Sequence, residues 1–225
     1  MELDRLKKEQ MQLAESIVLK DKVTKPKLIG GVDQSYLDNS TIISAIVVCK
    51  FPSMEIVEKK YTIKENVKFP YIAGFLAYRE VPIIVEAFEK LENKPDMIIC
   101  NFNGILHPRK CGAASHLGIS LNIPTIGVAK NKLLGKEKEG QVFIDSQLRA
   151  VALKTKDHAN PIYVSPGHLI SLTTSAKIVT KCLKEHKLPE PLYLAHRYAV
   201  KLKKKLKEKD SKIQQQTNTP EKISA

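Results

Sequence analysis

The sequence predicts an α/β fold with a mixed β-sheet, in which an antiparallel meander is followed by parallel strands and the sheet is flanked by helices. Over residues 27–64, three runs rich in β-branched residues are separated by turn residues, as in a meander. The apolar runs at 97–100 and 124–129 are separated by a helix-like segment, which is typical of parallel strands. The 225-residue chain, with 43% hydrophobic residues, is long enough for one such domain with a full core.

The N-terminal half is expected to contain two helices around the meander. Residues 2–20 are charged and helical in character. Helical periodicity over 78–93 is interrupted by Pro82, and proline is tolerated in a first turn, so this helix should begin near Val81 with Glu80 at its start. The three strands of the meander are expected at 27–36, 41–49 and 55–64, with a turn at 37–39.

The C-terminal half is expected to alternate strands with helices. Small residues at 112–115 allow a helix over 108–121 to pack closely on the sheet, and Ser171 is a suitable N-cap for a helix that runs to Leu183. Strands are expected at 97–100, 124–129 and 162–164, a hairpin over 140–153, and a loop at 165–168.

Charge favours a polyanionic partner. The net charge is +13 and the isoelectric point is about 9.5, which favours nucleic acid; a lysine-rich proteome, in which solvated lysines mean little, is the alternative. Much of the excess lies in the run Lys201–Lys209. We expect residues 1–210 to form a single catalytic domain and residues 211–225 to form a disordered basic and polar tail.

Other compositional features bear on location. No apolar run approaches the roughly 18 residues that a membrane span requires. The charged N-terminus lacks an apolar signal core, so a cytoplasmic protein is expected. The four cysteines lack metal-type spacing and are expected to be reduced core residues.

Two carboxylates are candidates for chemistry. Asp33 interrupts an apolar strand after two glycines, which permit close approach of a ligand or metal; a turn or edge-strand aspartate is the alternative. Glu80 alone would be interpreted as a solvated residue at a helix start. Because functional residues collect at the carboxyl ends of parallel strands, Asn101, Lys130 and the 165–168 loop are expected at one edge of the sheet.

Three further side chains have both a functional and a structural interpretation. His107, held extended before a proline, is a capping or core histidine or a catalytic one. Tyr71 lies on a proline-stiffened loop, where an aromatic ring either stacks on bases or packs under its loop. Lys130 ends an apolar strand, so a phosphate contact and a rim position are both consistent with it.

Taken together, five motifs closely resemble the endonuclease V family over about residues 5–200. The motifs are Gly-Val-Asp-Gln-Ser-Tyr (31–36), Pro-Tyr-Ile-Ala-Gly-Phe-Leu-Ala-Tyr-Arg-Glu (70–80), Asn-Gly-Ile-Leu-His-Pro-Arg-Lys-Cys-Gly-Ala-Ala-Ser-His-Leu-Gly (103–118), Pro-Thr-Ile-Gly-Val-Ala-Lys (124–130) and Ser-Pro-Gly-His (165–168). The resemblance implies a ribonuclease H-like fold and a DNA-repair endonuclease. That enzyme would use Mg²⁺, with Mn²⁺ as a substitute, to cleave DNA on the 3′ side of deoxyinosine.

The resemblance also implies roles for individual residues. Asp33, Asn101 and Glu80 are expected to bind the metal. Asp33, Glu80, His107 and Lys130 match catalytic positions, and Tyr71 matches the wedge that probes the lesion. Tyr71, His107, Lys130, His168 and His196 are expected to contact nucleic acid.

The chain departs from the family pattern at Asn101. The pattern reads Asp-Gly-x-Gly, whereas this chain reads Asn101-Phe102-Asn103-Gly104. An amide oxygen can coordinate Mg²⁺ but brings no negative charge, so weak metal affinity and low cleavage are expected. Asp96 lies five residues earlier, roughly 16 Å away along an extended strand, and cannot substitute.

Two rival functions remain open. The first is a relative of endonuclease V that binds inosine-containing strands without cutting them. The second is an electrostatic coat protein for nucleic acid, which would show no inosine preference and a steep salt dependence. Inosine-containing RNA is an alternative substrate to DNA, and a monomer without membrane partners is expected.

Overall fold

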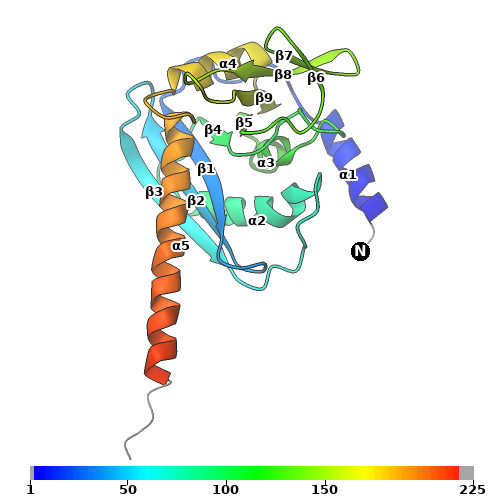
Figure 1. Cartoon of the computed structure of the whole chain (residues 1–225). Helices are drawn as coiled ribbons and strands as arrows, with labels where there is room; N and C mark the ends of the chain where they lie inside the picture. Colours follow the sequence, from blue (N-terminus) through cyan, green and yellow to red (C-terminus); the bar gives the residue numbers. More distant parts are fainter. Residues whose placement is uncertain (1–2, 218–225) are drawn as a thin grey trace, which may run out of the picture.

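The structure is a computed structural model that describes residues 3–217 of the chain. Five helices and nine strands occur in this range (Figure 1). The helices are α1 (Leu3–Glu15), α2 (Leu76–Glu89), α3 (Ala113–Leu121), α4 (Leu172–Lys181) and α5 (Glu190–Thr217). The strands are β1 (Leu28–Tyr36), β2 (Ile42–Lys50), β3 (Ile56–Lys64), β4 (Met97–Cys100), β5 (Thr125–Ala129), β6 (Lys136–Lys138), β7 (Gln141–Ile144), β8 (Gln147–Leu153) and β9 (Ile162–His168).

The strands form one mixed sheet in the order β3-β2-β1-β4-β5-β9-β8-β7-β6. The predicted meander is confirmed, because β1 pairs antiparallel with β2 and β2 antiparallel with β3. The parallel part is confirmed for β1–β4 and β4–β5. The predicted hairpin is also confirmed as β7 and β8, whose turn residues Asp145 and Ser146 both have positive φ.

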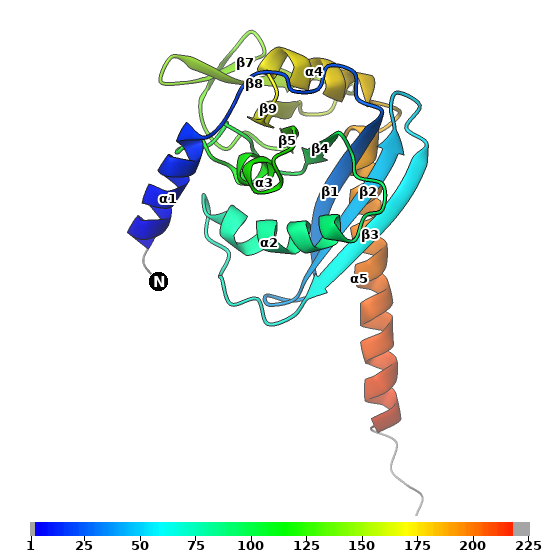
Figure 2. The same ribbon diagram turned by 180° about the vertical axis from the view of Figure 1, so that it is seen from behind.

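Helices cover both faces of the sheet (Figures 1 and 2). Side chains of neighbouring strand residues point to opposite faces, and β4 makes this visible. Ile98 packs with Ile84 of α2 and Leu117 of α3, whereas Ile99 packs with Val179 of α4 and Leu192 of α5. The parallel centre of the sheet is therefore buried on both sides, which explains its continuous apolar runs.

The first helix is shorter than predicted. It ends at Glu15 rather than at residue 20. The backbone beyond it bonds instead to the end of β9: the Val18 amide donates to His168 Nδ1, and the Lys22 amide to the Leu169 carbonyl. Tertiary hydrogen bonds have replaced helical ones in this segment.

The second helix begins earlier than predicted, which changes the place of Glu80. It starts at Leu76, so Pro82 lies inside it and Glu80 is a buried residue of its second turn rather than an exposed residue at its start. Arg79 beside it is also buried, and its guanidinium donates to the carbonyls of Phe69 and Asn39. These distant partners stabilise the early turns, and helical periodicity alone could not reveal them.

The expected loop at 165–168 is wrong, because these residues belong to β9. Strand β9 runs antiparallel to β5 and pairs His168 with Thr125. His168 therefore lies at the amino end of β5, whereas Lys130 follows the carboxyl end of the same strand. The predicted cap of the helix after β9 is confirmed, because the Thr174 amide donates to Ser171 Oγ at 3.2 Å, but α4 ends at Lys181 rather than at Leu183.

The last helix was not anticipated in its full length. Helix α5 continues to Thr217, past residue 210 where the disordered tail was expected to begin. The remaining tail residues, 218–225, lie outside the described range. Within residues 3–217, no helix combines the length and the apolar composition needed to cross a membrane.

Candidate active site

Asp33 is the centre of the candidate site. It lies in β1, one position beyond the last residue pair that joins β1 to β4, and it is buried. Its Oδ1 accepts hydrogen bonds from the Gln34 amide at 2.9 Å and from Asn101 Nδ2 at 2.8 Å. Its Oδ2 lies 2.7 Å from His196 Nδ1. A buried carboxylate is held in one orientation by these contacts.

Asn101 reaches Asp33 because parallel strands end side by side. Val32 of β1 pairs with Cys100 of β4, so the next residue of each strand meets its counterpart at the same edge. The Asn101 amide also donates to the Val32 carbonyl at 3.2 Å. The sequence predicted this convergence, and the structure places the two side chains in direct contact.

Glu80 approaches the same edge from α2. Its Oε1 accepts a hydrogen bond from the Tyr36 hydroxyl at the end of β1. Burial, and secondly the nearby negative charge of Asp33, raises the pKa of the Glu80 carboxyl to about 8. A cation bound between the two side chains would favour the ionised form of Glu80.

The side-chain oxygens near Asp33 are suitable ligands for a hard divalent cation, although they carry fewer negative charges than a site with three carboxylates. Carboxylate and amide oxygens are the ligands that Mg²⁺ prefers, and Asp33, Glu80 and Asn101 offer them at one edge of the sheet. Within residues 3–217, no three Asp, Glu, His or Cys side chains are grouped closely enough to bind a metal. The third acidic ligand is absent because Asn101 stands in its place.

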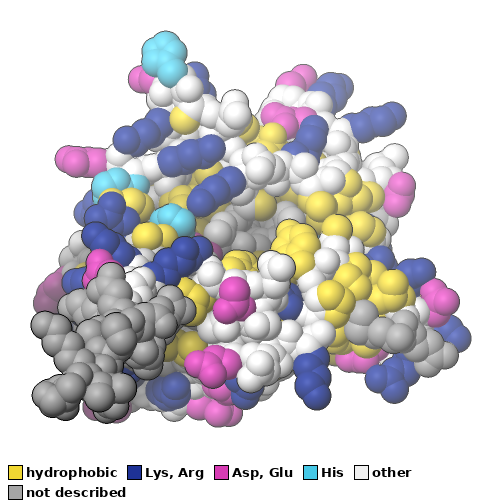
Figure 3. Space-filling model, turned by 60° about the horizontal axis from the view of Figure 1, so that its bottom comes forward, with side chains coloured by type: hydrophobic (Ala, Val, Ile, Leu, Met, Phe, Trp, Pro, Cys, Tyr) yellow, Lys and Arg dark blue, Asp and Glu magenta, His cyan; other side chains and the backbone are white. Residues whose placement is uncertain are grey.

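A cavity of about 330 Å³ opens beside Asn101. It joins the carboxyl ends of β4 and β5 to the loop before α2 and to α1. Predicted residues Tyr71, Asn101, His107 and Lys130 line it, together with Gln10, Ala73, Gly74, Leu76, Ala77, Phe102, Asn103, Gly112, Ala113, Ala129, Asn131 and Leu133. Figure 3 shows a hollowed face of the molecule with Lys and Arg side chains gathered around it.

Tyr71 and Lys130 lie at the mouth of this cavity. The Tyr71 ring is 69% exposed, so it is free to contact a ligand and does not pack under its loop. Lys130 follows β5 and is exposed. An exposed aromatic ring and an ammonium group at one cavity mouth suit a base and a phosphate, respectively.

His107 has a different place from the one expected of a phosphate contact. It is buried, with Nε2 at 3.1 Å from the Gly74 carbonyl and Nδ1 accepting from the Arg109 amide at 3.3 Å. Burial, and secondly the Arg109 charge, lowers its pKa to about 4, so the ring is neutral near pH 7. Nε2 thus holds the loop that carries Tyr71, whereas Nδ1 fixes the segment that carries Arg109.

The same loop is held by two residues that the sequence analysis missed. Gln10 Nε2 and Arg109 Nη2 donate to the Gly74 carbonyl at 3.1 and 2.7 Å, and Arg109 Nε donates to Gln10 Oε1 at 2.6 Å. Arg109 belongs to the quoted His-Pro-Arg motif, which could have indicated it. Gln10 has no local signal, because its partners lie 64 to 101 residues away.

The remaining two histidines of the predicted set lie in different parts of the molecule. His196, on α5, contacts Asp33, and its side chain is 38% exposed, so the structure places it at the site. His168 lies at the other end of β5, buried against the chain after α1. The structure therefore brings Asn101 and His196 into direct contact with Asp33, with Glu80 near enough for the Asp33 charge to affect its pKa. It places Tyr71, His107 and Lys130 at the adjoining cavity and leaves His168 apart.

Phe102 replaces a glycine of the family pattern without opening the site. Its side chain is buried in the cluster between α2 and α3 and also lines the cavity. The backbone behind it packs closely on β5, where a Cβ at Gly127 would lie 2.6 Å from the Phe102 carbonyl. The loop of Asn101–Gly104 is thus anchored at both its side chain and its backbone.

Comparisons with known proteins agree with this geometry. The Endonuclease V family model matches residues 11–197. Endonuclease V of Dictyoglomus turgidum is 42% identical over 201 residues, covering 86% of this chain and 87% of the relative. The catalytic domain of human Endonuclease V superposes with a TM-score of 0.82 at 29% identity, covering 91% of this chain and 97% of that one.

A third relative has been crystallised with DNA. Ciona intestinalis Endonuclease V, in complex with a 24mer DNA containing an inosine followed by a ribo-adenosine, has a TM-score of 0.82 and 30% identity. The match covers 91% of this chain and 99% of that chain. With the mixed sheet and its flanking helices, these likenesses confirm the predicted ribonuclease H-like fold.

Proposed function

The chain belongs to the endonuclease V family of nucleases, and from that premise we propose that it recognises inosine in DNA and cleaves the strand on the 3′ side in a Mg²⁺-dependent reaction. The observation that carries this proposal is the meeting of Asp33, Asn101 and Glu80 beside a cavity bordered by Tyr71. The inosine-containing DNA bound by the Ciona relative supports the choice of substrate. A role in DNA repair follows from that substrate.

The cavity suits a base that has left the stack. Its volume of about 330 Å³ lies within the usual range for ligand pockets, and apolar side chains form much of its wall. Tyr71 at its mouth would occupy the gap left by the displaced base. Inosine pairs weakly, so its displacement costs less than that of a matched base.

Residues around Asp33 would prepare the phosphate for cleavage. Asp33, Glu80 and the Asn101 side chain would hold the Mg²⁺ ion, which when bound activates water and stabilises the leaving 3′ oxygen. His196 keeps the Asp33 carboxylate in place. Lys130 would neutralise a phosphate oxygen at the cavity mouth. His107, being neutral and fully hydrogen-bonded, keeps the Tyr71 loop in position.

One observation favours a second candidate function, which is inosine binding without cleavage. Asn101 directs its Nδ2, rather than its oxygen, at Asp33. In this arrangement the amide donates to the carboxylate that would bind the ion, and it must turn before its oxygen can serve as a ligand. A site of this kind retains the cavity and Tyr71 but binds Mg²⁺ weakly.

A nicking assay with the Asn101→Asp variant separates the two functions. Restoring the third carboxylate should lower the Mg²⁺ concentration for half-maximal nicking of an inosine duplex at least about tenfold, because even supporting groups of metal sites are worth that much. If the parent protein nicks the inosine duplex in Mg²⁺ or Mn²⁺, the proposed endonuclease activity is supported. If it binds the duplex without nicking it, the second function is supported. An RNA strand with the same sequence tests the ribose tolerance.

The matched control is Asn103→Asp, which adds the same charge two residues away. An equal gain from both variants would mean that added charge alone, and not a ligand beside Asp33, explains the effect. No gain from Asn101→Asp, with inosine binding retained, would contradict the proposed metal role of this position.

A further inference from the structure

Helix α5 extends well beyond the sheet and beyond the part of the chain that matches the family. It begins on β1 and β2 with buried Leu192, Ala195 and Ala199. Its second half has no strand beside it in either view (Figures 1 and 2). The match to the family model ends at residue 197, before the lysine-rich run of α5 begins.

The projecting part is strongly basic. Between Lys201 and Lys209 there are six lysines and one acid, Glu208, which together carry five of the chain's thirteen net positive charges. The next charged residues in the sequence, Asp210 and Lys212, cancel each other. Lys204, Lys205, Lys207 and Lys209 are exposed, and Glu208 lies 3.8 Å from Lys204. So many like charges on one helix repel one another unless a polyanion is bound.

Part of this charge lies in line with the candidate active site. His196, at the start of the helix, contacts Asp33 at 2.7 Å. At about 100° per residue, the seventh and eleventh positions after His196 return to within about 20° of its direction. These positions are Lys203 and Lys207. One stripe of α5 thus joins the catalytic carboxylate to two lysines, with Lys204 next to the stripe.

The stripe has the length of a short run of nucleotides. At about 1.5 Å per residue, Lys203 and Lys207 lie roughly 10 and 16 Å beyond His196 along the helix. Successive phosphates of one strand are about 3.4 Å apart along a duplex, so these lysines reach phosphates about three to five nucleotides from the cut.

The order of the site residues sets the direction. The cavity is joined to Asp33 through Asn101, and Asp33 is joined to α5 through His196. The displaced base would lie in the cavity, and the cut would lie beside Asp33, on the 3′ side of the base. Helix α5 extends from Asp33 away from the cavity, so it follows the strand beyond the cut. The flank that α5 can accompany is therefore the 3′ one.

We propose that Lys203, Lys204 and Lys207 on the projecting half of α5 bind the phosphates of the duplex on the 3′ side of the lesion. This inference rests on the proposed function for its polarity. The contacts are electrostatic and independent of base sequence, because lysines on one face of a helix reach phosphates and not base edges.

The test measures binding, so it does not depend on cleavage. Binding of an inosine-containing duplex is measured for the parent and for the triple variant Lys203→Gln, Lys204→Gln and Lys207→Gln. Glutamine retains helix propensity, and circular dichroism verifies α5. The 5′ flank is constant, and the 3′ flank has about two or about twelve base pairs, the shorter ending before the reach of the lysines.

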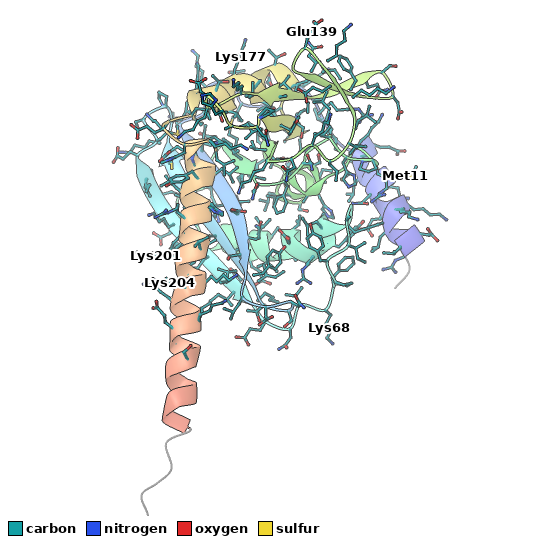
Figure 4. All side chains as sticks on the ribbon, in the orientation of Figure 1. Met11, Lys68, Glu139, Lys177, Lys201 and Lys204 are labelled. Atoms are coloured by element: carbon teal, nitrogen blue, oxygen red, sulfur yellow. The ribbon has the colours of Figure 1, made fainter. Side chains whose placement is uncertain are left out.

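The control variant removes the same charge at another place. Lys177, Lys181 and Lys184 are exposed on and just after α4. Figure 4 shows Lys177 at one end of the molecule, whereas Lys201 and Lys204 lie along α5. Changing all three to glutamine leaves α5 intact.

With the long 3′ flank, the salt slope of the triple variant should be smaller than the parent slope by about 2.7, or about 0.9 for each lost phosphate contact. This corresponds to about a 40-fold difference in affinity loss between 50 and 200 mM salt. With the short flank, the triple variant and the parent should bind alike, and the α4 control should follow the parent throughout. Equal slopes for parent and triple variant on the long flank would overturn the inference. So would an effect that depends on the 5′ flank instead. A parent without preference for inosine would overturn the proposed function, which is a separate outcome.

Discussion

At the scale of single residues, burial shifts the pKa values of two ionisable side chains at the candidate site. Glu80 and His107 are both buried, and burial moves their pKa values toward the neutral form, upward to about 8 for Glu80 and downward to about 4 for His107. Glu80 lies near the carboxylate of Asp33, so a bound cation would favour its ionised form. His107 lies between a carbonyl and an amide, and its neutral ring suits both of these hydrogen bonds.

The neutral state of His107 makes stability depend on pH. Its folded pKa of about 4 lies below the ordinary value of 6.5, so the unfolded chain binds the proton more readily between these values. The contribution of His107 to the free energy of unfolding is fully present above pH 6.5. It is lost as the pH falls toward 4, by about 3 kcal/mol in total.

Urea unfolding of the parent and of His107→Gln from pH 7 to pH 4 measures this effect. The variant should lose less stability over the range, because it has no ring to protonate. The exposed His158, changed to glutamine, is the control. An equal loss in the parent and in His107→Gln would show that other groups cause the acid sensitivity.

At the scale of elements, glycine sets how closely α5 approaches β1. A Cβ built on Gly31 would lie 2.0 Å from the Pro191 carbonyl oxygen, in the first turn of α5. Backbone cannot move aside as a side chain does, so the helix would have to shift. His196 lies on the same helix, and the shift would move it from Asp33.

Gly31→Ala should therefore destabilise the fold by about 3 kcal/mol, at the upper end of overpacking costs. It should also weaken Mg²⁺ binding, through displacement of His196. Gly30→Ala is the matched control, because its Cβ would meet only side chains, those of Pro95 at 3.1 Å and Ile98 at 3.3 Å. Thermal unfolding and Mg²⁺ titration of both variants measure the two effects. Similar stabilities for the two variants would contradict close contact between α5 and β1.

At the scale of the whole molecule, the proposed metal site couples binding to the fold. Its residues lie on β1, after β4, on α2 and, through His196, on α5, so a cation bound there would stabilise all of these elements together. A ligand present at 100 times its dissociation constant adds about 2.7 kcal/mol to stability. A third carboxylate without a cation has the opposite effect, because like charges repel in a buried site.

Asn101→Asp should thus lower the melting temperature in EDTA and raise it more than the parent in millimolar Mg²⁺. Differential scanning calorimetry with and without Mg²⁺ measures both changes, and it requires no cleavage. The Asn103→Asp variant should gain no more stability from Mg²⁺ than the parent does. Equal Mg²⁺ stabilisation of the parent and Asn101→Asp would mean that the ion does not bind beside residue 101.

The amino-acid sequence by itself determined the type of sheet, an antiparallel meander followed by parallel strands. Runs of β-branched and apolar residues predicted β1–β5, with Asp33 in β1, Asn101 after β4 and Lys130 after β5, because local side-chain patterns record which face of a strand is buried. The motifs identified the family and, through it, Tyr71 and His196.

Only the tertiary structure decided the start of α2, the antiparallel direction of β9, the Gln10–Arg109 contacts and the reach of α5. Each depends on partners far away in the chain, which local periodicity does not encode. Arg79 donates to carbonyls far away in the chain, and the antiparallel direction of β9 places His168 at the opposite end of β5 from Lys130. Long-range packing overrides local preference wherever a segment's best partner is not its neighbour.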